Sequence, residues 1–156
     1  MSASATLKAA KAALLSVCTS LYPAADGVVY GPADDYDGPE LLVEIRDASW
    51  SEREGEGRQS PQRRRWYDFS IDLVVVVSSG GGEEVQQSVT EAAMDAIGLL
   101  EDYLQDSGVV GSQQTSLGGV VEWARVTDSE FTDEDEDIEH GRTTTATATV
   151  SGRFLA

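Results

Sequence analysis

Residues 66–77 read Trp-Tyr-Asp-Phe-Ser-Ile-Asp-Leu-Val-Val-Val-Val, and this stretch decides the fold. Every odd-numbered residue from Tyr67 to Val77 is apolar, whereas Asp68, Ser70 and Asp72 alternate with them. A period of two places the apolar set on one face of a β-strand and the polar set on the other. The stretch therefore predicts a strand with one buried face.

The segment before it predicts a partner strand and a long connection. Residues 40–47 alternate in the same way and form the partner strand of a hairpin. Residues 49–65 between the two strands are rich in Glu, Arg, Gly and Gln, and are expected to form an Arg-rich hairpin loop. Seventeen residues without regular structure are unusual inside a compact domain and indicate either function or disorder.

Two further strands are expected at the end of the chain. Residues 120–131 start apolar and turn polar, and residues 142–155 alternate threonine with small apolar side chains. Between them, residues 128–141 are expected to form an acidic loop, because positions 128–139 hold eight carboxylates that repel one another. The threonine-rich strand is expected to be an exposed edge that can pair with another sheet.

Two stretches have the three- and four-residue apolar spacing of amphipathic helices. The first helix is expected over residues 4–21, where Pro23 stops it, and carries Cys18 on its apolar stripe. The second begins at Glu83 after three glycines, and its interior Gly98 suggests close packing against the sheet. Its expected buried stripe is Val85, Val89, Ala92, Ala93, Ala96, Leu99, Leu100, Tyr103 and Leu104.

With a short strand at residues 27–31, the element order becomes α-β-β-β-α-β-β. This order predicts an α+β domain over residues 1–156, with two helices covering one antiparallel sheet of four to five strands. The length of 156 residues suits a single domain.

The charge excludes several kinds of partner. The chain has 28 acidic and 11 basic side chains, and the net charge of −17 opposes binding to a nucleic-acid backbone or an anionic membrane. The longest apolar run, residues 73–77, is far shorter than the roughly 20 residues of a membrane span. No signal peptide is visible, so the sequence indicates an intracellular or virion protein.

The residue types give little support to catalysis or metal binding. Cys18 is the only cysteine and His140 the only histidine, which excludes a disulfide, a cysteine zinc site and a multi-histidine site. The acidic run lacks the glycine and glutamate of an EF-hand, since Ile138 and Thr144 occupy those positions, although weak divalent binding outside any motif stays open. We expect no catalytic residue, no metal site and no cofactor.

The charge is strongly patterned along the chain. Five of the eleven basic residues fall within thirteen positions of the hairpin loop, and five carboxylates follow one another in the acidic segment. We expect these residues to form a subunit or partner interface. They are Arg53, Arg58, Arg63, Arg64, Arg65, Asp133, Glu134, Asp135, Glu136 and Asp137.

The order of elements resembles the tail terminators of long-tailed bacteriophages. The resemblance covers a helix ending at residues 21–23, the Gly27–Gly31 segment, the hairpin with its long polar loop, the strand at 65–71, and the ending at 147–154. It implies a homohexameric ring in the virion, at the head-proximal end of the tail, assembled in the host cytoplasm. Such a ring stops tube polymerisation and offers its other face to a head-completion protein, while DNA passes through the lumen as cargo.

Two features of this sequence are compatible with such a ring. The arginine loop of one copy can meet the acidic segment of its neighbour, and a carboxylate-lined lumen repels phosphates. The alternative function, from another class, is an acidic DNA mimic that inhibits a nucleic-acid-binding enzyme. A basic arm brings no advantage to a mimic, which favours the ring.

Overall fold

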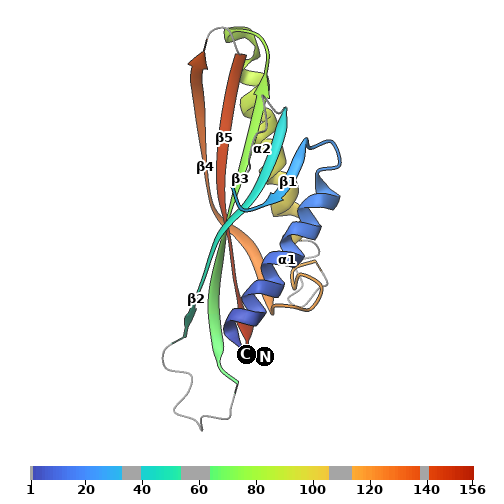
Figure 1. The fold of residues 1–156 in the computed structure, drawn as a ribbon, viewed down its shortest axis with the longest axis vertical. Coiled ribbons are helices and arrows are strands. Elements are labelled where there is room, and N and C mark those ends of the chain that lie inside the picture. The colour runs from blue at the N-terminus through green and yellow to red at the C-terminus, as the bar shows by residue number, and fades with distance from the viewer. Residues whose placement is uncertain (1, 33–39, 54–63, 106–113, 138–140) are drawn as a thin grey trace.

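The computed structural model describes residues 2–32, 40–53, 64–105, 114–137 and 141–156. Within them, two helices cover one face of a five-stranded sheet, in the order α-β-β-β-α-β-β, which confirms the expected α+β class. The elements are α1 (Ala3–Leu21), β1 (Gly27–Tyr30), β2 (Leu41–Glu52), β3 (Trp66–Ser79), a short 3-10 turn (Glu83–Val85), α2 (Gln86–Leu104), β4 (Trp123–Asp137) and β5 (Gly141–Leu155). Figure 1 shows the long strands running along the length of the molecule.

The strand order in the sheet is β1-β2-β3-β5-β4. The pairs β2–β3, β3–β5 and β4–β5 are antiparallel, but β1 pairs with β2 in parallel, so the sheet is mixed rather than purely antiparallel as expected. The threonine-rich strand β5 lies between β3 and β4, so the expectation that it forms an exposed edge is wrong. Within the described sheet, the edges are β1 and β4.

Strand β3 supplies the centre of the core. Its apolar odd-numbered residues from Phe69 to Val77 are buried, as the alternation predicts, and face the helices. In β5, Ala146, Ala148 and Val150 are buried on the same side. The opposite side of the sheet, here called the open face, carries the alternating polar residues of these strands.

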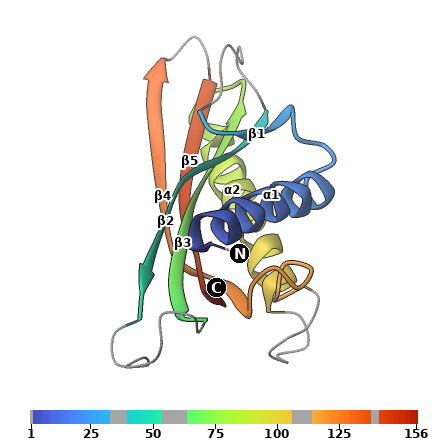
Figure 2. The ribbon, with the colours of Figure 1, turned by 60° about the horizontal axis from the view of Figure 1, so that its bottom comes forward.

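Helix α1 covers the sheet on the side of β1 and β2, and α2 covers β3, β5 and β4, so both helices lie on the same face (Figure 2). The Ser2 side chain accepts a hydrogen bond from the Ala5 amide at 3.2 Å and caps the start of α1. Leu14 and Cys18 are fully buried on its inner stripe. The Tyr22 hydroxyl, just after α1, donates to the Ala96 carbonyl of α2 and joins the two helices.

The expected stripe of α2 is partly wrong. Ala92 and Leu99 are exposed, and Ile97, which the expected stripe omits, is fully buried. Gly98 does not pack closely, because a methyl group placed on it would meet no atom within 4 Å. The helix is rotated slightly from the predicted orientation so that Ile97 and Leu100 face the sheet.

Both charged segments contain more strand than expected. Strand β2 continues through Glu52, so residues 49–52 belong to the sheet rather than to the Arg-rich loop. Strand β4 continues through Asp137, so most of the expected acidic loop at 128–141 is also strand. Pairing of β4 with β5 satisfies backbone groups over this length and outweighs the mutual repulsion of the carboxylates.

Candidate functional site

The described arginines of the arginine-rich segment, Arg53, Arg64 and Arg65, lie where β2 ends and β3 begins, at one end of the long axis (Figure 1). Arg53 donates its backbone amide to the Trp66 carbonyl at 3.1 Å, and the backbones of Arg65 and Ala156 exchange hydrogen bonds of 2.7 and 3.0 Å. These bonds hold both ends of the segment firmly against the sheet. Arg58 and Arg63 lie outside the described residues.

Two of the arginines that the structure describes here are paired with carboxylates of their own chain. The Arg65 Nη1 lies 2.8 Å from the Glu52 Oε1, and the Arg53 Nε lies 3.6 Å from the Asp68 Oδ2. These pairs are exposed to solvent, so they contribute little to stability. Arg64 is also exposed.

Further arginines, which sequence reasoning missed, lie near this end on the open face. The Arg153 guanidinium makes two hydrogen bonds of 3.1 Å to the Glu122 carboxylate and lies 4.7 Å from the centre of the Trp66 ring. Arg125 lies 4.9 Å from the centre of the Trp123 ring. Trp123 and Arg125 are two residues apart, so they share a face in a strand, and the sequence carries a signal for their contact. Arg153 and Trp66 are far apart in the sequence and meet only because β3 pairs with β5.

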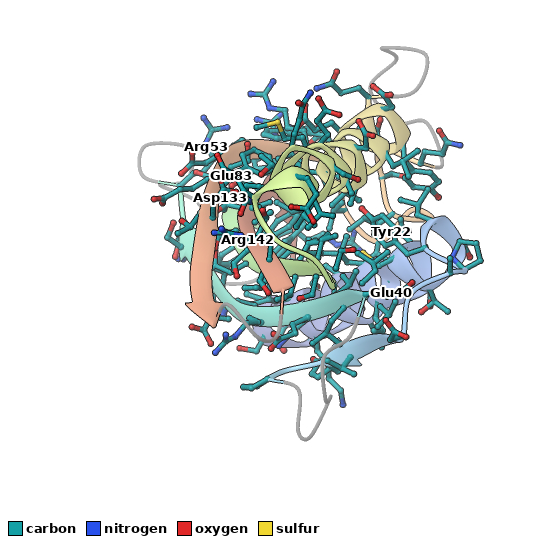
Figure 3. The ribbon with its side chains drawn as sticks, turned by 90° about the horizontal axis from the view of Figure 1, so that it is seen from above. Tyr22, Glu40, Arg53, Glu83, Asp133 and Arg142 are labelled. Atoms are coloured by element: carbon teal, nitrogen blue, oxygen red, sulfur yellow. The ribbon has the colours of Figure 1, made fainter. Side chains whose placement is uncertain are left out.

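The acidic segment lies at the opposite end, beside the start of α2. Seen along the long axis, Asp133 and Arg142 lie next to this helix start (Figure 3). The Asp133 Oδ1 accepts hydrogen bonds from the Thr144 hydroxyl at 2.7 Å and the Thr90 hydroxyl at 2.8 Å. Asp133 therefore connects β4 to β5 and to α2.

These hydroxyl donors lower the pKa of the Asp133 carboxyl below its ordinary value of 3.8, with Thr144 contributing most. Thr144 is fully buried, and Gln86 donates to Thr90 at 3.1 Å, so the network continues into the core side of the sheet. The backbones of residues 134–137 extend β4, and their side chains lie outside the described part.

The register of β3 with β5 fixes the separation of the two charged ends. Trp66 pairs with Leu155 at the arginine end, and Val77 pairs with Thr144, the neighbour of Asp133, at the acidic end. At about 3.3 Å per residue, these positions lie roughly 36 Å apart. The structure therefore does not bring the two predicted segments together, and they cannot neutralise one another within one copy.

Cys18, the only cysteine of the chain, is fully buried in the core. Burial raises the pKa of the Cys18 thiol to about 12, which removes its nucleophilic thiolate near neutral pH. His140 lies outside the described residues. In the described parts of the chain, no group of three or more His, Cys, Asp or Glu residues is placed to hold a metal ion, and no helix is both long and apolar enough to cross a membrane.

No family model matches the chain, and no curated protein matches it. The candidate site consists of two charged surfaces, the arginine end and the acidic end, at opposite ends of the sheet.

Proposed function

We propose that the chain is a tail terminator of a long-tailed bacteriophage. In this role, copies close into a homohexameric ring on the head-proximal end of the tail tube, stop its polymerisation and provide the head-joining surface. The α-β-β-β-α-β-β order, which runs through the chain as the resemblance implies, supports the proposal.

The observation that carries the proposal is the opposite charge of the two ends of the subunit. Arg53, Arg64 and Arg65 lie at one end of the long strands, and the acidic part of β4 lies at the other. When copies are arranged around an axis parallel to the strands, all arginine ends lie on one side of the ring and all acidic ends on the other. A terminator needs two unlike faces of this kind, one for the tube and one for the head.

This arrangement changes the expected role of the charged segments. Contact between the arginine end of one copy and the acidic end of the next requires an offset of nearly the full strand length. Such head-to-tail stacking extends into a filament rather than closing into a ring. The charged ends then serve the tail tube protein and the head-completion protein, and the overall negative charge lets DNA pass without adhering.

The test is tube assembly in vitro with the tail tube protein of the same phage. We expect native mass spectrometry to show a hexamer, and electron microscopy to show tubes with rings at one end that no longer elongate when fresh tube protein is added. An unrelated acidic protein of similar net charge is the control. A strict monomer that leaves tube growth unchanged would contradict the proposal.

The same mass measurement separates the DNA-mimic alternative. A mimic stays monomeric on its own and forms a tight complex with one basic enzyme, and DNA competes with it for that enzyme. A ring-forming terminator needs no such enzyme, and added DNA does not displace it from the tube end.

A further inference from the structure

The two helices of the subunit carry opposite charges. Helix α1 contains two lysines, Lys8 and Lys11, and no acidic residue, whereas α2 contains four acidic residues and no basic one. Both helices cover the same face of the sheet (Figure 2), so one layer of the molecule contains a basic helix and an acidic helix. The acidic residues of α2 are Glu91, Asp95, Glu101 and Asp102.

These charges do not neutralise one another within one copy. The Tyr22 hydroxyl donates to the Ala96 carbonyl, which marks the sides on which the two helices face one another. Lys11 lies on the other flank of α1, where its ammonium is 4.2 Å from the centre of the Tyr30 ring in the edge strand β1. Lys8 is exposed, and among the described residues no ion pair joins either lysine to a carboxylate. Both lysines are therefore available to a carboxylate of another molecule.

Large exposed apolar side chains accompany these charges. Tyr30, which contacts the α1 lysine, is 53% exposed, and Met94 and Leu99 of α2 are 47% and 49% exposed. Met94 follows Glu91 by three residues and Leu99 precedes Asp102 by three, so each is a neighbour of a carboxylate on the helix surface. Each helix thus combines charge with an uncovered apolar group whose burial favours association.

The net charge restricts how copies of this chain can associate. Each copy carries a charge of −17, so two copies repel one another unless their contact places cations of one against carboxylates of the other. Contact between α1 of one copy and α2 of another meets this condition. Because the two surfaces differ, the contact is heterologous, and such contacts form a closed ring when their rotation closes.

We propose that α1 of each copy binds α2 of the next copy around the ring, with Lys8 and Lys11 against the carboxylates of α2. This inference rests on the proposed ring and names its subunit interface. The occupant of each helix surface is a second copy of this chain, which gives α1 to one neighbour and α2 to the other.

The test is zero-length cross-linking with a carbodiimide, which joins an amine to a carboxylate only where the two groups are in contact. Apart from an amino terminus, Lys8 and Lys11 supply every primary amine of the chain. The protein is assembled from a mixture of unlabelled and heavy-isotope-labelled copies, cross-linked, digested and analysed by mass spectrometry. We expect peptides of mixed isotope content that link these lysines to residues 91–102, which identifies contacts between copies.

The matched control is the double variant Lys8→Arg, Lys11→Arg, which keeps both charges but removes both amines. It should keep the hexameric mass and lose the cross-links between α1 and α2. A hexamer whose lysines link to carboxylates elsewhere in the neighbouring copy, or to none, would overturn the helix contact and leave the ring intact. Two copies joined by the expected links would keep the helix contact and remove the ring, whereas monomers at every concentration would remove both.

Charge reversal gives a second measurement that needs no cross-linker. Lys8→Glu should weaken association of the copies by about tenfold, because it places a carboxylate against the acidic helix of the neighbour. Arg125→Glu, at an exposed position on the open face, changes the net charge by the same amount and should leave association unchanged. An equal loss in both variants would assign the effect to overall repulsion and overturn the proposed contact.

Discussion

At the scale of single residues, close approach between strands decides where side chains are excluded. Gly152 lies in β5 between Phe69 of β3 and Ala124 of β4. A methyl group at Gly152 would lie 2.0 Å from the Trp123 carbonyl oxygen and 2.8 Å from the Phe69 ring. A glycine usually weakens a strand, but Gly152 leaves room for the Trp123 carbonyl oxygen and the Phe69 ring, which lie where a larger residue would place its side chain.

We expect Gly152→Ala to lower the free energy of unfolding by about 2–3 kcal/mol, the upper range for overpacking a core. The backbone oxygen cannot move aside without breaking the β4–β5 ladder, so the cost is not relieved by a side-chain rotation. Chemical denaturation monitored by tryptophan fluorescence measures the change. A loss below about 0.5 kcal/mol would show that the strands separate easily at this point.

Asp133 gives a prediction about pH. Its pKa is lowered in the folded chain, so its hydrogen bonds stabilise the fold fully above the unfolded-state pKa, and this stability is lost as the pH falls through the lower folded value. Asn at this position still accepts hydrogen bonds but does not titrate. We therefore expect the stability difference between the wild type and Asp133→Asn to be constant above about pH 5 and to shrink below pH 3.8.

Urea denaturation across this pH range measures that difference. The control is the same substitution in a Thr90→Val, Thr144→Val background, which lacks both hydroxyl donors. There the difference should no longer depend on pH in this way. A pH dependence that survives in this background would assign the effect to charges other than this network.

At the scale of elements, the spacing of apolar residues predicts those strands and helices whose pattern can be read from neighbouring residues. Strand β3 and helix α1 were predictable because alternating or helical spacing is written in adjacent residues. The acidic half of β4 was not, because its strand conformation depends on β5 and on the Thr90 bond from α2. The rotation of α2, with Ile97 buried and Leu99 exposed, likewise depends on how the helix meets the sheet.

Helix α2 contains a second glycine, Gly98, at which substitution should have the opposite effect on stability from Gly152. Because Gly98 meets no atom within 4 Å, Gly98→Ala should raise the free energy of unfolding by about 0.5–1 kcal/mol through helix propensity alone. Thermal and urea unfolding measure the gain. A loss of stability would mean that Gly98 is covered after all, as the sequence alone had suggested.

At the scale of the whole molecule, the order of the strands in the sheet could not be predicted from the sequence. The prediction of an exposed β5 was wrong because strand order follows long-range pairing, and β5 is inserted between β3 and the edge strand β4. The Arg153–Trp66–Glu122 cluster was missed for the same reason, since its members come from three distant parts of the chain. The sequence predicted two oppositely charged segments, but only the register places them at opposite ends.

The opposite ends give the last prediction, which concerns the faces of the proposed ring. If the arginine ends lie together on one face, Arg64→Glu should leave the hexameric mass unchanged. It should weaken binding to either the tube or the head-completion protein by about tenfold, because a charge at an interface rim mainly alters electrostatic attraction. Raising salt from about 0.1 M to about 1 M should weaken the same contact in the wild type, since the screening length falls from about 10 Å to about 3 Å.

Arg46→Glu, farther from that end on β2, is the control and should leave both contacts intact. Native mass spectrometry and tube-binding assays measure the two effects separately. Dissociation of the ring by Arg64→Glu would instead place the arginine ends between subunits.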